Sequence, residues 1–309
     1  MSTERPYSQL HPGLQLITFI AITLGMLFAC GAIALGIIWV VYGGTTFNQV
    51  LEMNVSTAAG LQALWILQLI STTLPLFLVP LIFSYWIVRE PQSYLKANIG
   101  FTPVLLILVF ITMLFSSPII EVLGNLNQRM VLPHFMKGVE DWMRNSEKSA
   151  EKAQNLMLKM NTISDLLWDL LLVGLLTAIA EELMFRGVVQ TIFLRWTRNP
   201  HAAIWITAIL FSAFHMEFYG FLPRLMLGIL FGYFVYWSGS IWASVWAHFI
   251  NNGTAVLVTY LYEHKKIKIS PDDQHVFNYN GYVLSIVITV FLLYIYRTIS
   301  LAENRGQRA

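Results

Sequence analysis

The sequence has few charged residues, and those it has are unevenly placed. Only 12% of its 309 residues are Asp, Glu, Lys or Arg, whereas 56% are hydrophobic. Soluble domains carry about 25% charged residues, so a single soluble globule is excluded. No charged residue occurs between Arg5 and Glu52, between Glu52 and Arg89, or between Lys96 and Glu121. About 20 apolar residues suffice to cross a bilayer, so we predict a multi-pass protein integral to the plasma membrane.

Two further scarcities exclude other classes of protein. Cys30 is the only cysteine, which excludes a disulfide framework and a cysteine metal cluster, and we interpret it as a small core residue. The 19 Lys and Arg nearly balance the 17 Asp and Glu, so no nucleic-acid partner is indicated. We expect membrane lipid and a membrane-associated peptide or protein as partners. Gly228 and Gly232 form a GxxxG spacing that we interpret as internal packing, so we expect a monomer.

The apolar runs are far longer than the ~10 residues of a barrel strand, so the predicted fold is all-α. We predict about eight transmembrane helices in a single integral membrane domain covering residues 1–309. They are expected near residues 14–42, 59–88, 102–123, 165–196, 200–216, 222–237, 241–262 and 279–298.

The segment 124–164, between the third and fourth predicted spans, is polar. Its few apolar residues recur at helical spacing: Val139, Trp142, Met143, Ala150, Ala153, Met157 and Met160. This pattern is typical of an amphipathic connecting helix. Such a helix lies in the membrane interface, covers the mouth of a cavity, or packs on its neighbours while facing water.

Ionisable side chains gather in the second half of the chain. A charge at membrane depth is costly and by default faces a cavity with a function. The residues concerned are Glu181, Glu182 and Arg186 in the fourth predicted span, His215 at the end of the fifth, and His248 and Asn252 in the seventh. We interpret Glu121, Asp165 and Asp169, near predicted helix ends, as structural.

Helix geometry separates the two neighbouring glutamates. Glu182 and Arg186 are four residues apart, so they share a helix face and can form an ion pair. Glu181 points about 140° away from Arg186, since an α-helix turns about 100° per residue. This arrangement leaves Glu181 free to act as a general base. The alternative is that all three residues form one buried ion-pair cluster that holds helices together.

The polar residues are also expected at one depth. Counted from the predicted turn at 197–199, Glu181 and His215 both lie ~25 Å along their helices, and Asn252 lies ~20 Å from the next turn. Together with His248 they supply a base for water and donors for an oxyanion. Zinc is possible as well, because Glu181, His215 and His248 are suitable ligands. There is no HExxH helix, GxSxG motif or Cys nucleophile near a base, which disfavours zincin and covalent mechanisms.

Three motifs in these helices resemble those of a known family. They match, in order and spacing, the EExxxR, FxxxH and HxxxN motifs of the CAAX-protease and bacteriocin-processing (CPBP, also called Abi) intramembrane proteases. The matching residues are Glu181-Glu182-Leu183-Met184-Phe185-Arg186, Phe211-Ser212-Ala213-Phe214-His215 and His248-Phe249-Ile250-Asn251-Asn252. They define a motif-bearing catalytic core at residues 165–262.

The resemblance implies an eight-helix fold with a membrane-buried active-site cavity and peptide-bond hydrolysis by activated water. It assigns water activation to Glu181 and His215, the oxyanion hole to His248 and Asn252, and support to Glu182 and Arg186. No cofactor is predicted. The family is commonly labelled a metalloprotease, however, so zinc on Glu181, His215 and His248 remains an alternative.

We therefore predict an intramembrane endopeptidase that hydrolyses a peptide bond of a membrane-associated or lipid-modified substrate. The alternatives are a non-catalytic, peptide-binding immunity protein and a proton-coupled transporter, in which the same Glu and His residues bind peptide or relay protons. The sequence has no pair of Gly- or Pro-broken helices at matching places in two halves, which disfavours the transporter.

Overall fold

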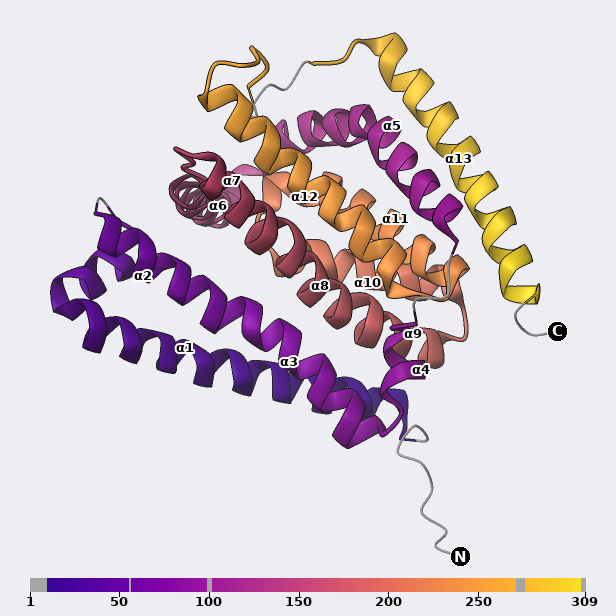
Figure 1. The fold of residues 1–309 in the computed structure, drawn as a ribbon, viewed down its shortest axis with the longest axis horizontal. Helices are drawn as coiled ribbons and strands as arrows, with labels where there is room; N and C mark the ends of the chain where they lie inside the picture. Colours follow the sequence, from indigo (N-terminus) through magenta and orange to yellow (C-terminus); the bar gives the residue numbers. More distant parts are fainter. Residues whose placement is uncertain (1–9, 56, 99–101, 271–275, 307–309) are drawn as a thin grey trace, which may run out of the picture.

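The protein is an all-α multi-pass membrane protein (Figure 1). The structure, a computed structural model, describes residues 10–55, 57–98, 102–270 and 276–306. Within these ranges, six helical stretches are long and apolar enough to cross a membrane: Pro12–Leu51, Ala58–Val88, Pro103–Gln128, Ile163–Thr197, Phe218–Ser238 and Tyr279–Glu303.

Eight spans are not confirmed, although a helix occupies each of the eight predicted places. The fifth predicted span is the helix α10 (Pro200–Phe214), which has 15 residues and is short for a bilayer. The seventh is α12 (Ile241–Glu263), which has 23 residues but is not among the six candidates. Its polar residues, including His248 and Asn252, lower its hydropathy.

The first two spans form an antiparallel hairpin, drawn in indigo and violet in Figure 1. The helix α1 (Pro12–Leu51) begins with Pro at its first position and with His11 accepting a hydrogen bond from the Gly13 backbone, and it kinks at Gly43, where φ is 78°. The return span consists of α2 (Ala58–Gln68), η2 (Leu69–Thr73), α3 (Leu74–Ile82) and η3 (Phe83–Val88). A short helix, α4 (Pro91–Leu95), follows.

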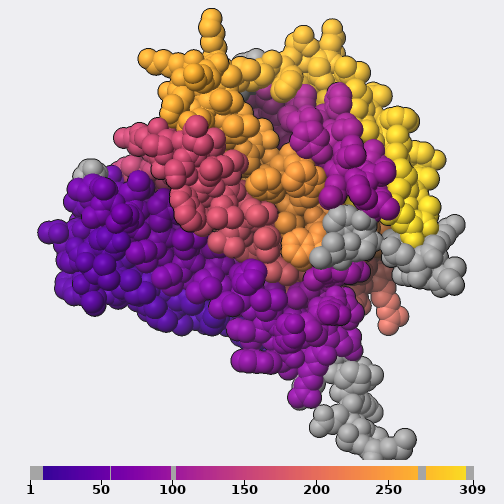
Figure 2. Space-filling model, viewed as in Figure 1, coloured from indigo at the N-terminus to yellow at the C-terminus, as the bar shows by residue number. Residues whose placement is uncertain are grey.

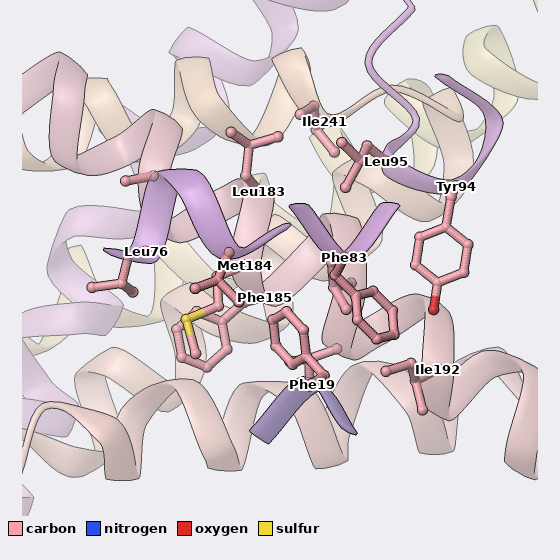
Figure 3. Close-up of a cluster of buried hydrophobic side chains, with 14 of the residues drawn as sticks. Phe19, Leu76, Phe83, Tyr94, Leu95, Leu183, Met184, Phe185, Ile192 and Ile241 are labelled. Atoms are coloured by element: carbon pink, nitrogen blue, oxygen red, sulfur yellow. The ribbon is translucent and has the colours of Figure 1, made fainter. Parts of the chain in front are cut away.

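A buried apolar cluster joins this hairpin to the fourth span. Phe19 of α1, Leu76 of α3 and Phe83 of η3 pack with Met184 and Phe185 (Figure 3). Phe185 lies between the glutamates and the arginine of the first motif, so this core fixes the motif against the hairpin. In the space-filling view the violet hairpin borders the pink fourth span (Figure 2). Cys30 is a buried free thiol, as predicted.

The fourth span is a single rod in which α-helical and π-helical turns alternate. It comprises α7 (Ile163–Asp169), η5 (Leu170–Leu176), α8 (Thr177–Glu182), η6 (Leu183–Val189) and α9 (Gln190–Thr197). Every residue of η6 is buried. π-Helical turns are frequent at functional sites, and η6 carries Arg186.

The remaining helices are α5 (Pro103–Gln128), α10, α11 (Phe221–Ser238), α12 and α13 (Tyr279–Gly306). The helices α10, α11 and α12 pack against the rod, whereas α5 packs on α11 and α12, and α13 packs on α5 and α11. The helices α5 and α13 lie side by side (Figure 1). A buried stripe of Ser285, Thr289, Tyr296 and Ser300 occupies one face of α13, while the opposite face leaves large apolar residues exposed. This division is what a helix facing lipid on one side requires.

The polar segment between the third and fourth spans contains η4 (His134–Met136) and α6 (Lys137–Met157). Met143 is the only buried residue of α6. Among the predicted apolar positions, Val139 and Trp142 are exposed, whereas Met160 is buried beyond the end of the helix. The amphipathic helix is therefore present, and its place at the membrane interface stays one of the predicted alternatives.

The helices α10 and α11 approach closely at the glycines of the GxxxG spacing. A Cβ atom at Gly228 would lie 2.9 Å from the Cβ of Ala208, and one at Gly232 would lie 2.8 Å from Cγ2 of Ile204. Such distances are too short for a carbon contact. Both glycines therefore pack inside the chain, as predicted.

Replacing Gly228 with Ala should lower the free energy of unfolding by about 1–3 kcal/mol, because the added methyl overpacks the contact with α10. The matched control is Gly36→Ala in α1, where a new Cβ meets no heavy atom within 4 Å and the gain in helix propensity should leave stability equal or higher. Thermal unfolding in detergent measures both variants. Equal stability of the two would contradict the close approach.

Candidate active site

A fully buried carboxylate, Glu182, organises the polar centre of the bundle. Its Oε1 accepts hydrogen bonds from Arg186 Nη1 and from His248 Nδ1, each at 2.9 Å. Its Oε2 accepts a hydrogen bond from the Ser244 hydroxyl. Buried charges must be paired and hydrogen-bonded, and here three donors from α12 and η6 meet this requirement.

Arg186 is equally buried and connects the fourth span to its neighbours. Its Nη2 donates to the carbonyl oxygen of Gly228 at 3.1 Å, and its guanidinium carbon lies 4.5 Å from the ring centre of Phe211. The predicted pair with Glu182 is present. The guanidinium does not bind both oxygens of that carboxylate, however. It spans the carboxylate and the α11 backbone.

Glu181, His215 and His248 converge in front of this buried pair. Glu181 Oε2 lies 3.7 Å from His215 Nε2 and 3.8 Å from His248 Nε2. The same oxygen is buried and has no hydrogen-bond partner among the described residues. The three side chains come from α8, the end of α10 and α12, which agrees with the common depth expected from the sequence.

The hydrogen bonds of the two imidazoles determine which ring nitrogen faces Glu181. His215 Nδ1 lies 2.9 Å from the carbonyl oxygen of Phe211, and His248 Nδ1 lies 2.9 Å from the Glu182 carboxylate. Both partners can only accept, so each Nδ1 carries the proton. In a neutral ring Nε2 then has a lone pair. With both rings neutral, Glu181 Oε2 and the two Nε2 atoms are all acceptors, so a separate donor is needed to join them by hydrogen bonds.

This protonation pattern limits how His248 can act. To donate a hydrogen bond from Nε2 to an oxyanion, His248 must be an imidazolium, with Glu182 holding its other N–H. The predicted oxyanion role therefore requires a doubly protonated ring. A neutral ring would accept a hydrogen bond from water instead.

Asn252 lies one helical turn after His248 on α12. Its Nδ2 donates to the carbonyl oxygen of Val173 at 3.3 Å, and its Oδ1 accepts from Asn251 Nδ2 at 3.2 Å. A side-chain amide has two N–H donors. One of them holds the side chain against η5, and the structure shows no partner for the other among the described residues.

The side chains of Glu181, His215 and His248 are of the types that bind zinc, but they are not arranged as a metal site. Metal-binding histidines donate their second N–H to a carboxylate or a backbone carbonyl, as His215 and His248 do here. Within the part of the chain that the structure describes, however, no three His, Cys, Asp or Glu side chains are assembled to hold a metal ion. Zinc on Glu181, His215 and His248 therefore stays an alternative for experiment.

Sequence reasoning missed three contributors to this centre. Ser244 hydrogen-bonds Glu182, and it could have been noticed as a polar residue four positions before His248, on the same helix face. The Phe231 ring stacks on His248 at a centroid distance of 5.1 Å. The carbonyl of Gly228 binds Arg186. No sequence pattern predicts the contributions of Phe231 and Gly228, because one is an apolar ring and the other is a backbone carbonyl.

The three acids interpreted as structural lie apart from this centre. Asp165 forms a capping box with Thr162 at the start of α7. Glu121 lies inside α5, not at a helix end as predicted, and accepts hydrogen bonds from Tyr282 and from two backbone N–H groups before α13. Asp169 is buried, and its Oδ2 has no hydrogen-bond partner within the described residues.

The fold and this centre define a class of protein: a polytopic, all-α membrane protein with glutamate and histidine side chains assembled in its interior. Residues 163–254 match the family model described as type II CAAX prenyl endopeptidase, Rce1-like. The match includes all three motifs, so the predicted CPBP resemblance is confirmed for this part of the chain. It supports an intramembrane protease.

A curated relative adds no functional information. The uncharacterized protein YpbD of Bacillus subtilis (strain 168) is 31% identical over 107 residues, which are 33% of this chain and 50% of the relative. The chain thus matches about half the length of this relative. No solved structure matches the chain.

Replacing Arg186 with Ala should lower the free energy of unfolding by about 3–5 kcal/mol, because it leaves the Glu182 carboxylate buried without its cation. Arg186→Lys should restore only part of this loss, since one ammonium cannot reach both Glu182 and the Gly228 carbonyl with the same geometry. Lys152→Ala, which removes an exposed charge on α6, is the control. Unchanged thermal unfolding of Arg186→Ala in detergent would refute the pairing.

Proposed function

We propose that this protein is an intramembrane endopeptidase that hydrolyses a peptide bond of a membrane-associated or lipid-modified substrate. The observation that carries the proposal is the orphaned Glu181 Oε2, placed between the Nε2 atoms of His215 and His248. A water molecule at this position would donate to the carboxylate and to an imidazole. Such a water is oriented and ready to lose a proton.

The reaction follows from these contacts. Glu181, with His215 beside it, takes a proton from water, and the hydroxide oxygen bonds to the carbonyl carbon of the substrate. The carbonyl oxygen becomes an oxyanion, which His248 in its imidazolium form and the second N–H of Asn252 stabilise. The C–N bond then breaks, and the proton held by Glu181 passes to the leaving amine. Peptide plus water gives a carboxylic acid and an amine.

An apolar cavity beside the motifs supports the proposal that the substrate comes from the membrane. It has a volume of about 370 Å³ and an almost wholly apolar lining. It lies between α1, η6 and α10 and is lined by Phe19, Met184, Phe185, Ala213 and Phe214, among others. Pockets of this size accommodate small apolar ligands. In this proposal the protein works as a monomer in the plasma membrane.

Glu181→Gln should abolish cleavage while leaving the protein folded, because an amide cannot accept the proton of water. A general base typically contributes 10²–10⁴-fold to the rate, so activity should fall by at least about 10²-fold. Glu52→Gln, the same change at an exposed position, serves as the control. The readout is mass spectrometry of membrane peptides with purified protein.

Two outcomes of this experiment would count against the proposal. Near-normal cleavage by Glu181→Gln would show that another group is the base. Wild-type protein that binds membrane peptides without cleaving them would favour the immunity-protein alternative, and proton flux that depends on Glu181 would favour the transporter.

Asn252→Ala should lower turnover by on the order of 10²-fold, as the loss of an oxyanion donor does. Asn251→Ala, which removes one of the two hydrogen bonds of the Asn252 side chain and keeps the one to Val173, should cost less. In the same assay, activity should survive exhaustive chelation. Stoichiometric zinc in active protein, with activity lost on chelation and restored by zinc, would instead assign Glu181, His215 and His248 as ligands.

A further inference from the structure

The loop that follows His215 is held from outside by two other elements. The helix α10 ends at Phe214 and is capped by His215. The next residue, Met216, has a left-handed φ of 55°, and η7 (Phe218–Gly220) leads into α11. We call residues 216–220 the His215 loop. Asn127 of α5 donates to the Phe218 carbonyl at 2.9 Å and accepts from the Leu222 N–H at 2.6 Å.

The second element is α6. Glu147 Oε2 accepts a hydrogen bond from the backbone N–H of Tyr219 at 3.1 Å. Arg144, three residues earlier and therefore on the same helix face, places its guanidinium carbon 4.3 Å from the centre of the Tyr219 ring. Tyr219 is thus held through both its backbone and its side chain.

Arg144 is itself held in place. Its Nε and Nη2 donate to Glu140 Oε1 at 2.9 and 2.7 Å, and Glu140 Oε2 accepts the Leu132 N–H at 3.2 Å. The hydrogen bonds from Arg144 hold the pKa of Glu140 below its ordinary value. Arg144 therefore remains paired near neutral pH.

These contacts stand out because α6 has little part in the core. One residue of the helix is buried, yet its polar face binds the chain four residues after His215. The N–H of Tyr219 lies in the first turn of η7, where N–H groups have no partner within the helix. An acceptor from elsewhere must satisfy it, and Glu147 does so.

We propose that Glu147 and Arg144 are positioning residues for His215. They fix Tyr219, the His215 loop and so the end of α10, where the His215 ring must stay within reach of Glu181. This inference rests on the proposed function, because it concerns the geometry in which water is activated. A displacement of about 1 Å in such a geometry can cost 10²-fold in rate.

The test compares Glu147→Ala with Glu147→Gln, which keeps an oxygen that can accept the Tyr219 N–H. Glu147→Ala should lower kcat by roughly 10- to 100-fold, with a much smaller change in KM, and Glu147→Gln should restore most of the rate. Glu151→Ala is the matched control, since this exposed acid lies one turn further along α6. Arg144→Ala should resemble Glu147→Ala.

A second readout does not depend on activity. Hydrogen exchange of peptides that cover residues 216–222 should become faster in Glu147→Ala and stay normal in Glu147→Gln and Glu151→Ala. Unchanged exchange in Glu147→Ala would overturn the inference. Faster exchange with an unchanged kcat would also overturn it, because the loop would then be held without positioning His215.

The two proposals can fail separately. Wild-type protein that cleaves no membrane peptide would count against the proposed function, and with it against any catalytic effect of α6. The exchange rates would still decide whether Glu147 holds the His215 loop. A loss of rate in Glu147→Ala that Glu147→Gln fails to restore would indicate a general structural role and contradict the positioning role.

Discussion

The carboxylate of Glu182 is the constraint on which the centre of this structure depends. A charge with no exposure to solvent is tolerated only when its partners are fixed around it. Arg186 supplies the opposite charge from the next helical turn, while Ser244 and His248 supply hydrogen bonds from α12. Because His248 is one of these partners, the buried Glu182 carboxylate also orients an imidazole ring of the candidate active site. Stability and chemistry therefore depend on the same contacts.

The remaining features of the centre follow from this arrangement. With Glu182 occupied by three donors, Glu181 has no Lys or Arg partner among the described residues and faces the two Nε2 atoms. The Phe211 ring lies over the Arg186 guanidinium and contacts the His215 ring edge-on at 5.0 Å. At Gly228, where α10 packs closely on α11, the backbone carbonyl accepts a hydrogen bond from Nη2 of Arg186. The Arg186 guanidinium is thus held by an ion pair, by an aromatic ring and by a backbone carbonyl.

Much of this was predictable from the sequence, for physical reasons. The paucity of charge indicated a membrane protein, and helical periodicity alone predicted that Glu182 pairs with Arg186. That pair is present even though π-helical turns interrupt the fourth span, because Glu182 and Arg186 remain one turn apart. The number of spans was not predictable, since α10 is short and α12 carries polar residues that belong to the site. The same residues that identify the site thereby weaken the membrane signal.

Other parts of the site could not be predicted from a single sequence. The hydrogen bond between Arg186 and the Gly228 carbonyl involves a backbone atom, and the contact between Glu147 and the Tyr219 N–H joins residues 72 positions apart. The protonation pattern of His248 depends on a partner in another helix. Periodicity describes one helix at a time, and these contacts arise only when helices meet.

The shared Phe211 ring has a consequence for the modularity of the protein. It contacts Arg186 of the fourth span, His215 at the end of α10 and His248 of α12, at centroid distances of 5.0 and 5.9 Å for the two imidazoles. The three motifs are therefore interlocked through one side chain. Related proteins could exchange these three helices only as a set. A single transplanted helix would not fit the side chains that contact Phe211 from the other two.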